Sequence, residues 1–139
     1  MTHDRPQVSI MIIEDNPVNA AQLVSIVTTI SNDITVSTTA ERGLLIWGHA
    51  FHSGKPYQIL ITDINLPGMN GKQLCQEIRD AEDMAQVKTR TQMIAISADP
   101  PAKHLLEACR LGAGCYLQKP IIREKLLEAL QHTGLFAAQ

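Results

Sequence analysis

Residues 59–71, ILITDINLPGMNG, join a short apolar segment to one carboxylate and then to a cluster of turn-forming residues. The segment 59–62 lacks polar alternation, which is typical of a strand buried on both faces of a parallel sheet. Asp63 follows it directly, and the loop beyond contains Pro67 and Gly71. Because a buried carboxylate is unstable without compensating partners, the sequence predicts that other polar groups converge on Asp63.

Strand-like segments of the same kind alternate with helical segments along the chain. Asn16-Pro17 and Asp99-Pro100 each combine an N-cap residue with a proline, which predicts the starts of the first and fourth helices. Strands are predicted at 8–13, 35–37, 59–62, 93–97 and 115–117, and helices at 17–30, 40–52, 71–82, 102–111 and 122–131. Five strand–helix repeats imply a doubly wound α/β sandwich, in which a five-stranded parallel sheet is covered by helices on both faces.

The composition indicates one globular domain. The chain has 139 residues, of which 45% are hydrophobic and 19% charged, so it can bury a substantial core. We expect a single domain over 1–139, with a core at about 8–131 and flexible ends at 1–7 and 132–139.

Charge, hydropathy and cysteine content indicate which partners and which cellular location the domain can have. A net charge of -2 and an aromatic content of 4% argue against direct nucleic-acid binding. No apolar run approaches the length of a membrane span, and residues 1–7 lack the apolar segment of a signal peptide. The three cysteines have no CxxC spacing, which favours reduced thiols and a cytoplasmic location.

Polar residues follow four of the predicted strands. Glu14-Asp15 ends the first strand, Asp63 the third and Ser97 the fourth, and the fifth runs into Lys119-Pro120. Each alone could be a helix cap, a turn residue or a solvated side chain. Together they should meet at the carboxyl edge of the sheet, where ligands bind in this architecture. Three carboxylates against one ammonium leave a deficit of positive charge, which Mg²⁺ would fit.

This set of residues resembles the receiver domain of two-component response regulators. The resemblance covers about residues 8–131, and DINLPGMNG looks like the family's loop after its phosphoacceptor, with Pro67, Met69 and Gly71 in the expected places. The glutamate of Glu14-Asp15 and the serine at Ser97 are variants that occur within the family. The resemblance implies a flavodoxin-like (βα)5 fold with strand order 2-1-3-4-5.

The resemblance also implies a chemistry. Asp63 would accept a phosphoryl group from a phosphohistidine of a histidine kinase or histidine phosphotransfer protein. Mg²⁺ would be held by Asp15, Asp63 and the backbone carbonyl of Asn65, with Glu14 acting through water. Lys119 would pair with Asp63 and later with a phosphoryl oxygen, and the Lys119-Pro120 bond would be cis.

The family further implies a conformational switch that controls a downstream effector or output domain. Ser97 would donate a hydrogen bond to the phosphoryl group, small Ala98 would leave that group accessible, and Tyr116 would rotate inward. The alternative for Tyr116 is a strand tyrosine with a hydrated hydroxyl. Asn65 and Asp99 would tune the lifetime of the phosphorylated state.

The first predicted helix lies in a segment without charge. Residues 16–32, NPVNAAQLVSIVTTISN, contain no Lys, Arg, Asp or Glu. Leu23, Ile26, Val27 and Ile30 recur at helical spacing and should face the sheet, which leaves the less buried positions Val18, Ala20 and Val24. We interpret these three as a docking face for a helical phosphodonor. The alternative is a helix that is buried more deeply than usual.

Two other functions compete with the phosphoacceptor. A phosphatase of the haloacid dehalogenase type also uses a nucleophilic aspartate, but it needs a second aspartate two residues later, where this chain has Asn65. A degenerate receiver that only binds proteins would not need the complete set of acids, hydroxyl and lysine. Nucleotide binding is disfavoured because neither GxGxxG nor GxxxxGK[ST] occurs. The EDNPVN segment looks like receivers of hybrid histidine kinases, and both that context and a stand-alone regulator stay open.

Overall fold

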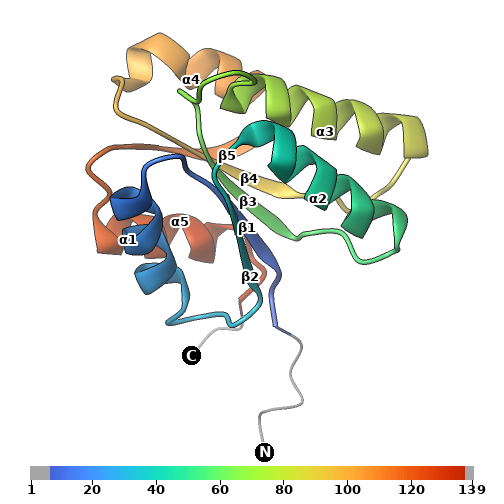
Figure 1. Ribbon diagram of the computed structural model, residues 1–139, viewed down its shortest axis with the longest axis horizontal. Helices are drawn as coiled ribbons and strands as arrows, with labels where there is room; N and C mark the ends of the chain where they lie inside the picture. Colours follow the sequence, from blue (N-terminus) through green and yellow to red (C-terminus); the bar gives the residue numbers. More distant parts are fainter. Residues whose placement is uncertain (1–6, 137–139) are drawn as a thin grey trace, which may run out of the picture.

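The computed structural model describes residues 7–136, in which five strands and five helices alternate along the chain (Figure 1). The elements are β1 (Ile10–Ile13), α1 (Pro17–Val27), β2 (Ile34–Ser37), α2 (Ala40–His52), β3 (Ile59–Asp63), α3 (Gly71–Ala85), β4 (Gln92–Ser97), α4 (Pro101–Arg110), β5 (Ala113–Gln118) and α5 (Arg123–His132). The strands form one parallel sheet in the order β2-β1-β3-β4-β5. This confirms the predicted doubly wound fold and its strand order.

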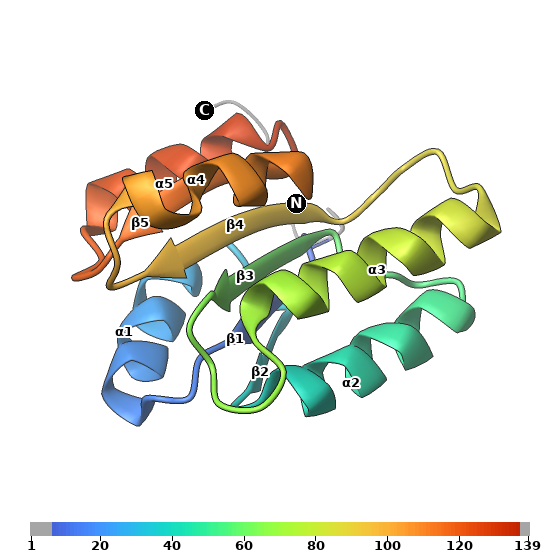
Figure 2. The ribbon, with the colours of Figure 1, turned by 90° about the horizontal axis from the view of Figure 1, so that it is seen from above.

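Helices cover the two faces of the sheet (Figure 2). Alternate residues of β1 pack in different cores. Ile10 and Ile12 of β1 pack in a core with α1 and α5, whereas Met11 and Ile13 pack in a second core with α2 and α3. Both cores consist mainly of aliphatic side chains that are almost completely buried. The sheet is therefore a rigid, apolar support whose carboxyl edge presents the loops after the strands.

The predicted N-cap of the fourth helix is wrong. Helix α4 begins at Pro101, its N-cap is Pro100, and no side chain caps it. Asp99 lies one residue too early for the predicted cap, and its backbone N–H donates to Ser97 Oγ at 3.0 Å. Its carboxylate is used elsewhere, as described below.

The fold extends beyond the predicted core boundary at 131. Helix α5 includes His132, and Leu135 and Phe136 pack against the core formed with α1 and α5. The expectation of flexible ends at 1–6 and 137–139 lies outside the described residues. Among residues 7–136, no helix combines the length and apolar character needed to cross a membrane.

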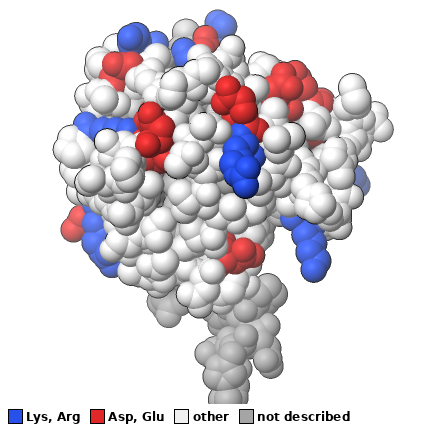
Figure 3. Space-filling view, viewed as in Figure 1, with Lys and Arg blue, Asp and Glu red and all other residues white. Residues whose placement is uncertain are grey.

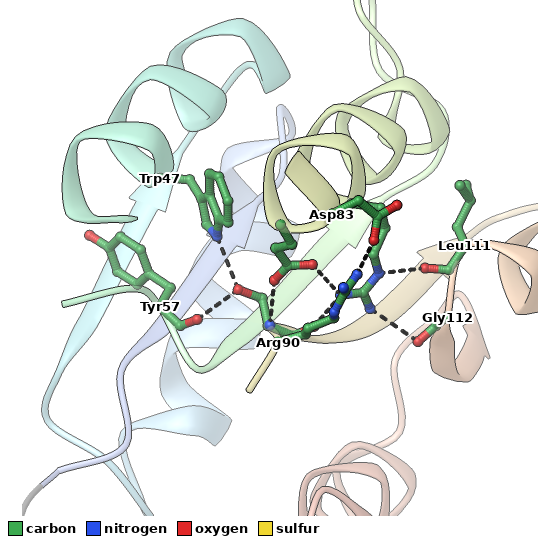
Figure 4. Close-up of polar contacts among 9 residues, drawn as sticks. Trp47, Tyr57, Asp83, Arg90, Leu111 and Gly112 are labelled. Atoms are coloured by element: carbon green, nitrogen blue, oxygen red, sulfur yellow. Dashed lines mark hydrogen bonds and ion pairs between the residues drawn. The ribbon is translucent and has the colours of Figure 1, made fainter. Parts of the chain in front are cut away.

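A buried ion pair lies near the amino ends of β4 and β5, opposite the carboxyl edge (Figure 4). Arg79 Nη1 contacts Glu82 Oε1 at 2.8 Å, and Glu82 is only 1% exposed. The guanidinium also donates to the carbonyl oxygens of Thr91 at 2.9 Å and Leu111 at 2.8 Å. One arginine therefore ties α3 to the segments that enter β4 and β5.

Thr91 extends this polar cluster to α2. Its N–H donates to Glu82 Oε2 at 2.8 Å, and its hydroxyl donates to the carbonyl of Tyr57 at 2.8 Å while accepting from Trp47 Nε1 at 3.0 Å (Figure 4). Trp47 is buried and its ring stacks on Phe51. The amino edge of the sheet is thus fixed by satisfied hydrogen bonds, a role that the sequence patterns did not indicate.

Candidate functional site

Asp63 is the last residue of β3, and its carboxylate lies at the carboxyl edge of the sheet. It is 4% exposed. Oδ1 accepts a hydrogen bond from the backbone N–H of Asn65 at 2.9 Å, and Oδ2 accepts from Lys119 Nζ at 2.6 Å. Each carboxylate oxygen therefore has a donor, which answers how the chain tolerates a charge at the end of a buried strand.

Lys119 also compensates Glu14. Its Nζ lies 2.7 Å from Glu14 Oε1, and Glu14 is completely buried. Burial raises the pKa of the Glu14 carboxyl above its usual value, against the opposing effects of Lys119 and the Asn16 N–H. Burial would lower the pKa of Lys119, but the hydrogen bond with Asp63 and the close contact with Glu14 outweigh it and hold this pKa above its usual value. The ammonium is therefore firmly charged between two acids.

The loop that carries Lys119 follows β5. The Lys119-Pro120 peptide bond is cis, and the Lys119 N–H donates to the carbonyl of Ser97 at 2.7 Å. This hydrogen bond continues the pairing of β4 with β5 beyond Gln118. The backbone thereby places the lysine beside the end of β3.

Three carboxylates lie close enough to share a cation. Oxygens of Glu14, Asp15 and Asp63 lie within 4.8 Å of one another, and Asp15 is exposed to solvent. Glu14 Oε1 is buried without a well-aligned hydrogen bond, although it lies beside the ammonium. Hard oxygen donors with an excess of negative charge fit a small divalent cation.

Ser97 and Asn65 connect the end of β4 to the loop after β3. Ser97 is completely buried, and its Oγ accepts hydrogen bonds from Asn65 Nδ2 at 3.1 Å and from the Asp99 N–H at 3.0 Å. Because both contacts use the oxygen as an acceptor, the hydroxyl proton is free to donate to a further group.

Asp99 is held by donors from three segments. Its Oδ2 accepts from Asn65 Nδ2 at 2.9 Å and lies 2.7 Å from His104 Nε2. Hydrogen bonds from Asn65 and His104 lower the pKa of the Asp99 carboxyl to about 2. Tyr116 of β5 donates its hydroxyl proton to the Asp99 carbonyl at 2.9 Å.

His104 is the residue of this region that the sequence analysis missed. It is 5% exposed on the inner face of α4, one helical turn from the buried Ala108. The spacing of the sequence could have indicated it. His104 shares a helix face with Ala108, four residues later, and follows Asp99 by five residues.

Gly71 allows the loop after β3 to close tightly. A Cβ atom at this position would lie 2.2 Å from the backbone oxygen of Asp63, which is impossible without a shift of the backbone. The Gly71 N–H donates to the carbonyl of Ile64 at 3.0 Å, and the Met69 N–H donates to Glu41 Oε2 at 3.1 Å. The loop is thus fastened both to its own strand and to α2.

The predicted residues of the first helix differ in exposure. Val18 is 76% exposed, whereas Ala20 and Val24 are half-buried and Val24 packs against the core. Much of the surface over α1 is uncharged (Figure 3). At the end of β4, Ala98 is exposed beside the buried Ser97.

Acidic residues, a buried hydroxyl and a lysine at the carboxyl edge of a 2-1-3-4-5 parallel sheet define a domain of the receiver class. The family sequence model described as response regulator receiver domain matches residues 10–131, so the chain belongs to this family. The family consists of signalling phosphoacceptors rather than conventional enzymes.

Individual relatives agree with this assignment. The virulence sensor protein BvgS of Bordetella bronchiseptica is 28% identical over 142 residues, which cover 96% of this chain and 11% of BvgS. The chain thus spans a small part of the length of such curated relatives.

Solved structures show the same fold. A chain from the complex of the Saccharomyces cerevisiae histidine phosphotransfer protein Ypd1 with the receiver domain of Ssk1 has a TM-score of 0.78 at 21% identity, covering 93% of this chain and 90% of that chain. The receiver domain of a Pseudomonas aeruginosa sensor histidine kinase, solved with a magnesium ion in its active-site cleft, has a TM-score of 0.74 at 23% identity, covering 93% of this chain and 99% of that chain.

Proposed function

We propose that this domain accepts a phosphoryl group on Asp63 from a phosphohistidine of a partner protein and changes conformation in response. The observation that carries the proposal is the position of Asp63, a nearly buried carboxylate that contacts Lys119 and lies within 4.8 Å of ligand oxygens from Glu14 and Asp15. A carboxylate in this setting can act as a nucleophile, because the Lys119 ammonium compensates its charge through a contact that can be exchanged.

The transfer requires in-line approach and neutralisation of charge more than covalent assistance. A carboxylate oxygen of Asp63 forms the new bond to phosphorus, and the bond from phosphorus to the donor's imidazole nitrogen breaks. The electron pair of that bond stays on the imidazole. Lys119 then turns from the carboxylate to a phosphoryl oxygen, a short movement for an ammonium that already lies 2.6 Å from Asp63 Oδ2.

The acidic cluster would hold Mg²⁺ through Asp15, Asp63 and the backbone carbonyl of Asn65, with Glu14 acting through water. When bound, the cation would neutralise the phosphoryl oxygens during transfer. Support for this site comes from the excess of carboxylates and from the Glu14 oxygen that lacks a well-aligned hydrogen bond.

Ser97 supplies the response to phosphorylation. Its hydroxyl proton is not used in the contacts with Asn65 and Asp99 and can be donated to a phosphoryl oxygen. A shift of Ser97 toward that oxygen would disturb both contacts and, through Asp99, the hydroxyl of Tyr116. The phosphoryl group thereby changes the β4–α4 loop, which a downstream effector or output domain can read.

The decisive experiment compares the wild-type chain with Asp63→Asn after incubation with acetyl phosphate and Mg²⁺. Intact mass should show a single phosphoryl adduct on the wild type that hydroxylamine removes, and the variant should show none. A hydroxylamine-resistant adduct, or equal labelling of Asp63→Asn, would contradict the proposal. A folded wild type that takes up no phosphoryl group would favour the binding-module alternative.

We propose that the phosphodonor is a histidine kinase or histidine phosphotransfer protein that docks on α1. The uncharged helix exposes Val18, and Gln22 Nε2 donates to the Ile121 carbonyl at 3.1 Å, which joins α1 to the loop before α5 beside the site. The Ypd1–Ssk1 complex shows that a histidine phosphotransfer protein can bind a receiver domain. Three free cysteines support a reducing, cytoplasmic setting for this exchange.

Val18→Glu tests the docking face better than a change at Val24, which packs against the core. Phosphotransfer from a histidine phosphotransfer protein that labels the wild type should slow, whereas labelling by acetyl phosphate should not. Leu45→Glu is a matched control, because Leu45 is 75% exposed on α2. Equal slowing by both variants, or equal loss of both labelling reactions in Val18→Glu, would argue against docking on α1.

A further inference from the structure

His104 is a buried imidazole that the phosphotransfer chemistry above does not use. It is 5% exposed, and its Nε2 lies 2.7 Å from Asp99 Oδ2. Its Nδ1 is buried without a hydrogen-bond partner among the described residues. The ring lies 6.5 Å from that of Tyr116, with the two planes inclined by 30°.

The direction of the His104–Asp99 hydrogen bond follows from the chemistry of its partners. An ionised carboxylate only accepts hydrogen bonds, so Nε2 must carry the proton that it donates to Asp99. A proton on Nδ1 would be a buried donor without an acceptor, which is unfavourable. The site therefore selects the tautomer with hydrogen on Nε2.

Asp99 is held at both its side chain and its backbone. Oδ2 accepts from Asn65 as well as from His104, and Lys103 lies 3.5 Å from the same oxygen with a side chain that is 63% exposed. Lys103 is therefore largely screened by water. His104 is the buried donor that α4 contributes to this carboxylate.

We propose that His104 is a positioning residue that prolongs the phosphorylated state by fixing the Asp99 carboxylate. This inference rests on the proposed phosphorylation of Asp63. Asn65 Nδ2 donates both to Asp99 Oδ2 and to Ser97 Oγ. The Asn65 amide therefore bridges the Asp99 carboxylate and the Ser97 hydroxyl that would contact the phosphoryl group. While His104 holds Oδ2, the carboxylate keeps this orientation.

Loss of the aspartyl phosphate is a hydrolysis that an unrestrained carboxylate would assist. A water oxygen forms a bond to phosphorus, and the bond from phosphorus to the Asp63 oxygen breaks. Its electron pair returns to the Asp63 carboxylate, and the water's protons go to inorganic phosphate and solvent. A carboxylate that turns toward the attacking water can accept a hydrogen bond from it and orient it. His104 keeps Asp99 from doing so.

The test compares decay of the adduct in wild type, His104→Leu and His104→Gln. Each protein is labelled with acetyl phosphate and Mg²⁺, separated from the phosphodonor, and followed by intact mass. Decay in His104→Leu should be faster by about threefold or more, since a hydrogen bond to a charged group is lost. His104→Gln should restore a slower decay, because the glutamine amide can donate to Asp99 while a merely apolar filler cannot.

A second comparison separates positioning from general loosening of the fold. In an Asp99→Ala background, His104→Leu should leave the decay rate unchanged, because the carboxylate through which His104 acts is absent. An equal acceleration in both backgrounds would overturn the inference, as would unchanged or slower decay in His104→Leu.

A third measurement needs neither a variant nor phosphorylation. In the wild type, ¹⁵N chemical shifts of the imidazole should show hydrogen on Nε2, and hydrogen on Nδ1 alone would overturn the inference. Failure to label the wild type at all would overturn the proposed function and this inference with it. A labelled wild type with a His104-independent lifetime would overturn this inference alone.

Discussion

Replacing Lys119 with methionine would remove the ammonium that compensates two buried acids. Methionine keeps much of the length of the side chain, so the change is mainly the loss of charge. In the absence of a divalent cation, Glu14 and Asp63 would then face each other with no ammonium between them. We expect the free energy of unfolding at pH 7 to fall by about 3 kcal/mol.

The distances set this magnitude. The ammonium lies 2.7 Å from Glu14 Oε1 and 2.6 Å from Asp63 Oδ2. At an effective dielectric constant near 20, each contact corresponds to roughly 6 kcal/mol of Coulomb attraction, most of which desolvation offsets. Breaking a buried pair costs about 3–5 kcal/mol in measured cases. The Lys119 side chain is 16% exposed, so the lower end of this range applies.

Urea unfolding at pH 7 measures the effect, with the fluorescence of the single, buried Trp47 as the signal. The loss caused by Lys119→Met should shrink in an Asp63→Asn background, because one of the two uncompensated charges is gone. Added Mg²⁺ should recover part of the stability of Lys119→Met by replacing the missing positive charge. An equal loss in both backgrounds, or no loss at all, would refute the electrostatic reasoning.

Three further predictions concern other buried groups. Burial raises the pKa of the Glu14 carboxyl in the native state above its usual value of 4.5. Between these two values the native state binds more protons than the unfolded chain, so the free energy of unfolding falls as the pH rises through this range. Glu14→Gln should abolish this fall in urea titrations without divalent cations. Arg79→Met should lower the unfolding free energy by about 3 kcal/mol, because it leaves the buried Glu82 unpaired. Gly71→Ala should cost about 1–3 kcal/mol by overpacking and should slow labelling of Asp63, because its Cβ meets the Asp63 carbonyl.

Each of these predictions has a control. Glu77→Gln changes an exposed glutamate of α3 and should leave the pH dependence intact; the same flattening as in Glu14→Gln would contradict the assignment. Arg79→Lys should recover only part of the stability lost in Arg79→Met, since one ammonium cannot reproduce the fork that contacts Glu82 and three backbone carbonyls. Gly48→Ala, where an added Cβ meets no atom within 4 Å, should be tolerated, unlike Gly71→Ala.

The fold and the strand-end residues could be predicted because both follow from local patterns. Unbroken apolar segments predicted a parallel sheet, and a parallel sheet brings its carboxyl ends to one edge. Asp63, Ser97 and Lys119 lie together for that reason, with Lys119 beside the acids as expected. The order of the strands came from the family resemblance, since periodicity alone does not determine it.

The errors and omissions concern side chains whose partners come from distant elements. Asp99-Pro100 carried a local cap pattern, but the helix begins one residue later and the carboxylate binds Asn65 and His104. The hydrogen bond from Trp47 to Thr91 joins α2 to the segment before β4, which lies 44 residues further along the chain. A sequence pattern reports what a residue does within its own element, and these contacts depend on tertiary packing.

The two edges of the sheet are held in different ways, and this difference suits a switch. At the amino edge, Arg79, Glu82 and Thr91 form a buried and satisfied cluster. At the carboxyl edge, α4 buries only His104 and Ala108, whereas α3 buries five residues. Because so little apolar surface holds α4, its position depends more on the polar contacts of Asp99. A phosphoryl group that drew Ser97 toward Asp63 would alter those contacts first, and so would bias the helix that has the fewest buried residues.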